Sequence, residues 1–256
     1  MKKSAIATLT LLFSSIVTPA IAAAPTTPPL VGYAAKGGGT VIDVPIPQSL
    51  LNAPLVDQNG KAFTLASLKG KTVVLTDSMT TCSDICPMTT VNMRDMATHF
   101  AASHVSNSIV GLELSIDAKR DTPSRMKAYQ NLYGSAAWTM GTGTATTLNS
   151  IWSWFGVYTK IVAADKETID WQTGKPESYD IDHDDVVIII GPNSHWRWLD
   201  LGTPAVANPK APNVLPTKMR TFLSASGKVN LITPSQPTWT TSSVYQAIDQ
   251  IFSLKI

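Results

Sequence analysis

The two cysteines of the chain, Cys82 and Cys86, are separated by only three residues and lie between two segments of different character. The preceding segment, 72–77 (TVVLTD), is nearly continuous in apolar residues, as a buried central strand is. Pro87 directly follows the second cysteine, and proline is favoured in the first turn of a helix, where its missing N–H is not needed. We therefore predict a strand-to-helix junction at the cysteine pair, with Cys86 at or just before the N-terminus of the helix.

The rest of the chain alternates between strand-like and helix-like segments. An Asn59-Gly60 turn between extended runs predicts a hairpin near the start of the folded part. After the cysteines, the patterns predict a helix, a strand at 108–117, helices at 121–134 and 148–156, strands at 157–162, 186–191 and 195–201, and a last helix at 242–255. This order predicts an α/β, thioredoxin-like fold with a central mixed sheet flanked by helices, an N-terminal hairpin and a long insertion before the C-terminal helix.

Composition divides the chain into three segments. Residues 1–22 combine Lys2 and Lys3, a short apolar run and small residues at the end, which is the order of a secretory signal peptide. Residues 23–49 are rich in Pro, Gly, Ala and Thr and are predicted to form a flexible arm, followed by a folded domain at 50–256. We therefore expect a periplasmic protein, associated with the inner membrane only if the signal segment remains as an uncleaved anchor.

Charge and cysteine content exclude two classes of protein. Loss of the signal segment removes two of the 20 basic residues and none of the 18 acidic ones, so the mature chain has no net charge. A chain without a basic excess lacks the electrostatic footprint of a nucleic-acid-binding protein, and we expect no nucleic-acid partner. Two cysteines are too few for a disulfide framework in an exported protein of this size, so we expect them to serve a local purpose.

The position of the sulfurs limits their chemistry. Unpaired N–H groups and the positive end of the helix dipole stabilise a thiolate, so we expect the pKa of Cys86 to be lowered. A purely structural disulfide would close a loop of only about five residues and would remove little entropy from the unfolded chain. A redox pair and a metal site both remain open. Two soft thiolates favour Cu(I), and an added imidazole also suits Cu(II) or zinc.

Four histidines could supply such an imidazole. His99 and His104 lie near the end of the helix after the cysteines, roughly 20 Å or more away, and are expected to be exposed to solvent. His195 belongs to the expected strand hairpin. His183 precedes the strand at 186–191, among acidic residues that could orient its ring or simply form a solvated loop: Asp182, Asp184 and Asp185.

The motif TTCSDICP at 80–87 resembles the signature of the Sco/SenC family of copper-binding thioredoxin-like proteins. Residues 115–134 resemble the family's second strand and the helix after it, and residues 182–193 resemble its histidine and the strand behind it. The resemblance implies three copper ligands: Cys82, Cys86 and His183. It also implies a role at the CuA centre of cytochrome c oxidase, either in copper delivery to subunit II or in keeping the cysteines of that centre reduced.

The sequence departs from the family pattern in three places. DSMTT at 77–81 replaces the usual aromatic residue and glycine before the first cysteine, and Gly191-Pro192 replaces the usual Asp-Pro. Residues 201–239 form an insertion that is longer than the corresponding family loop and has no counterpart in it. The first two departures leave the implied ligands in place, whereas the insertion could form a different partner surface.

We therefore expect a copper metallochaperone that binds one copper ion, Cu(I) or Cu(II), and serves cytochrome c oxidase subunit II or another cupredoxin-type client. The alternative is an enzyme, a thiol-disulfide oxidoreductase in which Cys82 and Cys86 are redox-active. A structural clip and a peroxidase are further alternatives; MTTC resembles a peroxidatic cysteine loop, but no partner arginine is evident. Four methionines near the pair are predicted to be core residues: Met79, Met88, Met93 and Met96.

Overall fold

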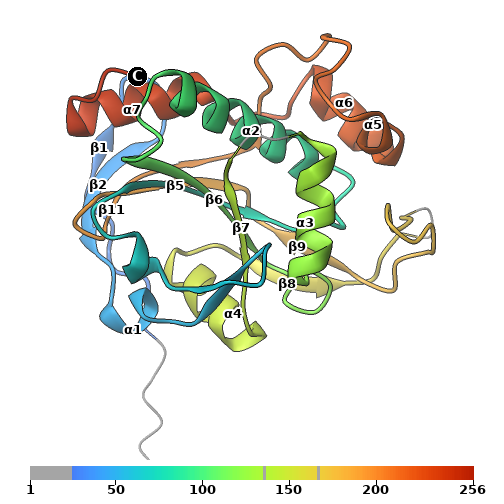
Figure 1. The fold of residues 1–256 in the computed structure, drawn as a ribbon, viewed down its shortest axis with the longest axis horizontal. Helices are drawn as coiled ribbons and strands as arrows, with labels where there is room; N and C mark the ends of the chain where they lie inside the picture. Colours follow the sequence, from blue (N-terminus) through green and yellow to red (C-terminus); the bar gives the residue numbers. More distant parts are fainter. Residues whose placement is uncertain (1–24, 135–136, 166–167) are drawn as a thin grey trace, which may run out of the picture.

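The computed structural model describes residues 25–134, 137–165 and 168–256. A nine-stranded mixed sheet in the order β1-β2-β11-β10-β5-β6-β7-β3-β4 forms the centre of the fold (Figure 1). The signal segment predicted at 1–22 lies outside the described residues. Within the described ranges, no helix is both long and apolar enough to cross a membrane.

Short elements build this sheet and its surroundings. The main sheet consists of β1 (Tyr33–Ala34), β2 (Thr40–Pro45), β3 (Leu55–Asp57), β4 (Ala62–Phe63), β5 (Thr72–Ser78), β6 (Ile109–Ser115), β7 (Thr139–Thr142), β10 (Val186–Ile190) and β11 (His195–Leu201). Two smaller sheets pair β8 (Thr159–Val162) with β9 (Asp180–His183), and β12 (Thr203–Pro204) with β13 (Thr238–Trp239). The helices are α1 (Gln48–Leu51), α2 (Cys86–Ala102), α3 (Pro123–Leu132), α4 (Ala145–Trp154), α5 (Thr217–Phe222), α6 (Ala225–Ile232) and α7 (Thr241–Phe252), with a 3-10 turn at Leu65–Leu68.

The central strand β5 is parallel to β6 and antiparallel to β10. Every residue of β5 is buried, because helices cover both faces of the sheet. Val74 belongs to the core formed with α2 and α7, whereas Val73 and Leu75 belong to the core formed with α4. Figure 1 shows α2 and α7 on one face and α4 on the other. A strand buried on both faces needs apolar side chains in succession, which explains the sequence of 72–77.

The connection β5–α2–β6, followed by the antiparallel pair β10–β11 and the last helix α7, is the thioredoxin-like arrangement. The predicted α/β fold with a central mixed sheet flanked by helices is therefore confirmed. The predicted hairpin is also confirmed, with β3 and β4 paired around Asn59-Gly60. Local signals placed the helix starts correctly, since α2 begins at Cys86 and α3 begins at Pro123 with Thr122 as its N-cap.

The segment predicted as a flexible arm, 23–49, contributes strands to the sheet. β2 pairs with β11, and β1 pairs with β2 at the edge of the sheet. Val41 and Ile42 of β2 are buried in opposite cores. The folded domain therefore begins before the predicted boundary at residue 50. The short apolar run of β2 lies among glycines and prolines, and its pairing with β11, far along the chain, decides its conformation.

Two other segments contain more regular structure than their sequences indicate. The polar insert at 163–182 leads into β9, which pairs with β8 outside the main sheet. The strand predicted at 157–162 therefore exists, but it does not join the central sheet. The insertion at 201–239 contains α5 and α6, seen at the upper right of Figure 1, after a proline-rich stretch that forms a loop as predicted.

We predict that Ile42→Ala lowers the free energy of unfolding by about 2–5 kcal/mol, because it removes a buried side chain from a packed core. Chemical denaturation monitored by tryptophan fluorescence measures the change. The control Val31→Ala removes a side chain that is 85% exposed and should change the free energy by less than about 0.5 kcal/mol. A negligible effect of Ile42→Ala would mean that β2 is not part of the folded domain.

Candidate metal centre

The cysteine pair lies where β5 ends and α2 begins. β5 ends at Ser78, and a loop at 79–85 leads to Cys86, the first residue of α2. Both cysteines are free thiols, and the exposed fractions are 6% for Cys82 and 1% for Cys86. The predicted strand-to-helix junction is confirmed, and the two sulfurs are buried at the N-terminal end of a helix.

The two thiols differ in acidity. The Cys86 N–H donates a hydrogen bond to the Sγ atom of Cys82 over 3.4 Å. The hydrogen bond from the Cys86 side chain, together with one from His183, outweighs burial and lowers the pKa of Cys82 to about 5. The hydrogen bond to Cys82 and burial raise the pKa of Cys86 well above its ordinary value. The expectation that Cys86 has the lowered pKa is therefore wrong, because Cys86 donates hydrogen bonds and Cys82 accepts them.

His183 is the last residue of β9, and its side chain is only 6% exposed. Its Nδ1 atom lies 2.8 Å from Oδ2 of Asp77 and 3.0 Å from the carbonyl oxygen of Asp184. A carbonyl oxygen can only accept a hydrogen bond, so Nδ1 carries a hydrogen, and deprotonation of the ring would leave the lone pair on Nε2. The ring lies close enough to Cys82 to lower the pKa of that thiol and to have its own pKa raised by it.

Asp77 holds the imidazole of His183, a role that the sequence analysis did not assign. Asp77 is 4% exposed, and its Oδ1 atom accepts a hydrogen bond from the Val186 N–H over 2.9 Å. Burial disfavours a charged imidazole, but hydrogen bonds to Asp77 and Cys82 outweigh it and raise the pKa of His183 well above its ordinary value. The sequence held one sign of this role of Asp77: the segment that begins with it replaces the aromatic residue and glycine that are usual in the family.

The acidic residues next to His183 differ in how closely they contact its ring. Asp185 has a carboxylate oxygen 3.8 Å from Nδ1, whereas Asp184 offers the ring its carbonyl oxygen and Asp182 is exposed. Burial, reinforced by the nearby charge of Asp77, raises the pKa of Asp185 to about 8. The suggested orienting role therefore applies to Asp184 and Asp185, and Asp182 fits the solvated-loop interpretation.

The predicted ligands are linked in a chain of contacts. Cys86 contacts Cys82, and Cys82 contacts His183. In the described part of the molecule, three possible ligand atoms that all lie within 4.8 Å of one another come from Asp77, His183 and Asp185, a group that contains neither sulfur. The ligand roles of Cys82, Cys86 and His183 therefore stay a prediction. Once deprotonated, two sulfurs and an imidazole nitrogen are a donor set for a soft or borderline metal ion.

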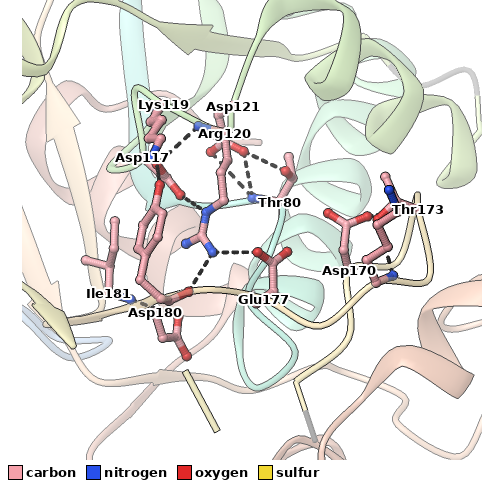
Figure 2. Close-up of polar contacts among 12 residues, drawn as sticks. Thr80, Asp117, Lys119, Arg120, Asp121, Asp170, Thr173, Glu177, Asp180 and Ile181 are labelled. Carbon is pink, nitrogen blue, oxygen red and sulfur yellow. Dashed lines mark hydrogen bonds and ion pairs between the residues drawn. The ribbon is translucent and has the colours of Figure 1, made fainter. Parts of the chain in front are cut away.

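A buried polar network supports the cysteine loop. Thr80 donates its hydroxyl and its N–H to Oδ1 of Asp121 over 2.5 and 3.1 Å, as Figure 2 shows. The hydroxyl also accepts a hydrogen bond from Nε of Arg125 over 2.6 Å. Nη1 of Arg125 lies 2.6 Å from Oδ2 of Asp170 in the polar insert. The arginine that the sequence did not reveal thus joins the cysteine loop to the insert, and its charge is already paired.

A second arginine fixes the start of β9. Arg120 forms ion pairs with Asp117 and with Glu177, the latter over 2.9 Å (Figure 2). Its Nη1 atom donates to the carbonyl oxygen of Tyr179 over 2.7 Å, and its guanidinium lies 3.8 Å from the centre of the Tyr179 ring. Tyr179 immediately precedes β9, so this anchor helps to hold His183 at the site.

The other histidines have different surroundings. The ring of His99 stacks on that of Tyr245, with 4.6 Å between their centres, and is half-buried; the expectation that it is exposed is wrong. His104 is exposed, as predicted. His195 pairs with Asp43 over 2.6 Å. His195 follows the end of β10 that pairs with the beginning of β5. The cysteines follow the other end of β5, so His195 and the cysteines lie at opposite ends of these strands.

The four methionines near the cysteines are core residues, as predicted. None is more than 2% exposed. Met79 packs in the core on the α4 side of the sheet, together with both cysteines, whereas the other three, from α2, pack on the opposite side: Met88, Met93 and Met96. Their burial accounts for them without a role in metal transfer.

An open cleft of about 1080 Å³ borders the cysteine loop. Ser83 lines it, together with Trp171 of the polar insert and residues 221–226 at the junction of α5 and α6. Neither Cys82 nor Cys86 lines the cleft. The cleft therefore borders the loop between the cysteines but is not lined by the sulfurs themselves.

Comparisons with known proteins converge on one family. The SCO1/SenC family model matches residues 53–200. The "Putative copper-binding protein" of Stutzerimonas stutzeri is 32% identical over 93 residues, which are 36% of this chain and 45% of that protein. The chain thus spans less than half the length of this curated relative.

Two solved structures are similar to parts of the chain. ScoI of Bradyrhizobium japonicum with copper bound is 24% identical and matches over 56% of this chain and 83% of its own, with a TM-score of 0.48. BsSco, described as a member of the Sco family of cytochrome c oxidase assembly proteins, is 21% identical and matches over 62% of this chain and 86% of its own, with a TM-score of 0.44.

Glu113 of β6 is a buried carboxyl group that packs against α2. It is 1% exposed, and Oγ1 of Thr90 donates to its Oε2 atom over 3.1 Å. Its Oε1 atom has no hydrogen-bond partner among the described residues. Burial outweighs the hydrogen bonds that Glu113 accepts and raises its pKa to about 8. Near pH 7 this side chain is therefore mainly a neutral acid.

We predict that Glu113→Gln flattens the dependence of stability on pH. The pKa of Glu113 rises from 4.5 to about 8 on folding, so the folded protein binds more protons between these values. The stability that the neutral acid contributes is fully present below the unfolded pKa and is lost as pH rises through the folded pKa. Between these two pKa values the free energy of unfolding falls by up to about 1.4 kcal/mol per pH unit.

Denaturant unfolding at several pH values across this window measures the slope. The control Asp249→Asn removes an exposed carboxyl group and should keep the wild-type slope. An unchanged slope in Glu113→Gln would contradict the assignment of the titration to Glu113.

Proposed function

The chain belongs to the SCO1/SenC family, and on that premise we propose that it is an exported, periplasmic copper metallochaperone. It carries one copper ion as cargo on three residues: Cys82, Cys86 and His183. The Sco family is associated with cytochrome c oxidase assembly, as the description of BsSco states. The proposed client is therefore subunit II of that oxidase, at its CuA centre, or another cupredoxin-type protein.

The observation that carries this proposal is the meeting of two sulfurs and one imidazole from distant parts of the chain. Cys82 and Cys86 are adjacent at the start of α2, and the ring of His183 reaches Cys82 from the end of β9. Thiolates are soft ligands and imidazole is a borderline one, so this set suits copper in either oxidation state. A disulfide clip needs no histidine, which disfavours a purely structural role.

Negative charge around the sulfurs favours a cation. The carboxyl groups of Asp77, Asp84 and Asp185 gather near His183, and the charges of the first two help to keep Asp185 protonated by raising its pKa. Buried charges that are only partly paired repel one another, and a bound cation relieves this repulsion. The surroundings of the sulfurs therefore support metal binding in addition to the ligands themselves.

Metal binding must displace protons at this site. Cys82 has a lowered pKa and is ready as a thiolate, whereas Cys86 has to lose its hydrogen. His183, whose pKa is raised, has to lose the hydrogen on Nε2 and keeps the one on Nδ1, toward Asp77 and Asp184. Because ligands bind in their deprotonated forms, we expect copper affinity to increase with pH.

A thiol-disulfide oxidoreductase is the second candidate, and the contrast between the two thiols favours it. The Cys82 thiolate would attack a client disulfide, forming a mixed disulfide and releasing one client thiolate. Cys86, after losing its proton, would then attack Cys82 Sγ, forming the Cys82–Cys86 disulfide and releasing the second client thiolate. Two electrons pass from the cysteine pair to the client, and no step requires the metal.

We predict that the reduced protein without residues 1–22 binds one equivalent of copper and shows a thiolate-to-Cu(II) absorption band. His183→Ala should weaken the band because one ligand is lost, and Cys82→Ser or Cys86→Ser should abolish it. The matched control His104→Ala removes an exposed histidine and should leave the titration unchanged. Copper titration followed by absorption spectroscopy, with circular dichroism to verify folding, tests all four variants.

The same variants distinguish the two candidates. Dithiol exchange requires both sulfurs but not the imidazole of His183. If His183→Ala binds copper as the wild type does, while the wild-type protein efficiently reduces a model disulfide, the oxidoreductase replaces the metallochaperone as the better explanation.

A further inference from the structure

The insertion at 201–239, which lies beyond the residues that the family model matches, supplies a helix that contacts the cysteine loop. α5 and α6 form the layer at the upper right of Figure 1, and α6 approaches the start of α2. Its contacts fall on Ser83 and Asp84, two of the three residues between the cysteines.

Three hydrogen bonds join α6 to the loop. The N–H of Ser224, the N-cap of α6, donates to the carbonyl oxygen of Ser83 over 2.8 Å. The hydroxyl of Ser226 donates to Oδ2 of Asp84 over 2.8 Å, and Nδ2 of Asn230 donates to Oδ1 of the same carboxylate over 2.8 Å. Together they hold both the backbone and the side chain of the loop.

Gly227 allows α6 to come this close. A Cβ atom at Gly227 would lie 2.5 Å from the carbonyl oxygen of Ser83 and 2.9 Å from that of Asp84. Both neighbours are backbone atoms that cannot move without moving the loop. Any residue larger than glycine would therefore separate the helix from the loop.

The stretch of the loop between the two sulfurs has few hydrogen bonds of its own. The N–H of Cys82 donates to the carbonyl oxygen of Met79 over 3.2 Å, and the N–H of Cys86 donates to the sulfur of Cys82 over 3.4 Å. Within the described part of the chain, the carboxylate of Asp84 accepts side-chain hydrogen bonds from α6 alone. The position of the loop between the two sulfurs therefore depends on α6.

We propose that α6 is part of the metal centre, with Ser226 and Asn230 as positioning residues that hold Asp84 and so fix the spacing of the Cys82 and Cys86 sulfurs. This inference rests on the proposed function and assigns a role to the insertion. A loop that is already ordered before the metal arrives loses less conformational entropy on binding, and the metal is held more tightly. The insertion thus anchors the middle of the loop, whereas the contacts of Thr80 with Asp121 and Arg125 anchor its start.

The variant Asn230→Asp tests this proposal. It is nearly isosteric and removes the donor to Asp84, placing a second carboxylate beside it. The Oδ1 atom of Asn230 also accepts the Ser235 N–H over 3.3 Å, a contact that aspartate retains. Ser226→Ala removes the second donor and adds no charge. The matched control on the same helix is Val229→Ala, which truncates a side chain that is 61% exposed.

We expect both test variants to weaken copper affinity by about 10-fold to 100-fold, as changes to residues that orient ligands generally do. Competition with a chelator of known affinity measures this change. The thiolate-to-Cu(II) band should shift, which a loss of global stability alone would not cause. In the metal-free protein, iodoacetamide should alkylate Cys82 severalfold faster, because the released loop exposes it. Val229→Ala should match the wild type in all three measurements.

The outcomes separate this inference from the proposed function. If the wild type binds copper through the cysteines and His183, but Asn230→Asp and Ser226→Ala have wild-type affinity and spectra, α6 is not part of the metal centre. If the wild type binds no copper, the proposed function fails, and the alkylation rate alone decides whether α6 positions the loop. Equal alkylation rates in all variants would overturn the positioning role.

Discussion

The contact between the buried carboxylate of Asp77 and the imidazole of His183 joins the two halves of the site. Asp77 belongs to β5, the strand that leads into the cysteine loop, and His183 ends β9, which comes from another part of the chain. The N–H of Val186 holds the second oxygen of Asp77, so the carboxylate cannot turn away from the ring. With Nδ1 engaged in this way, Nε2 is the ring nitrogen left to interact with the sulfur of Cys82.

Polar contacts hold the rest of the site in place from two sides. Arg125 joins Thr80, at the start of the cysteine loop, to Asp170 of the polar insert. On the other side, α6 binds Asp84 in the middle of the loop. Such directional contacts fix the course of the loop around the two sulfurs, which are themselves buried. The two inserts of this chain are thus integrated with the cysteine loop and are not merely appended to the fold.

Local sequence signals predicted the parts of the site that depend on neighbouring residues. Pro87 after Cys86 placed the start of α2, and the apolar run of β5 placed the strand before it. The same signals could not reveal Asp77, because a carboxylate at the end of an apolar strand ordinarily faces solvent. They also gave the wrong thiol a lowered pKa, since the helix N-terminus acts on both sulfurs and the hydrogen bonds between the thiols decide between them.

The amino-acid sequence by itself determined the order of strands and helices, the position of the cysteine pair at a helix start, and the family of the chain. These features depend on residue types within a few positions of one another, where propensity and capping act. Only the tertiary structure decided that β2 joins the sheet, that Cys82 is the more acidic thiol, which nitrogen of His183 faces Asp77, and what α6 contacts. Each of these depends on burial and on partners far along the chain, which spacing in the sequence does not specify.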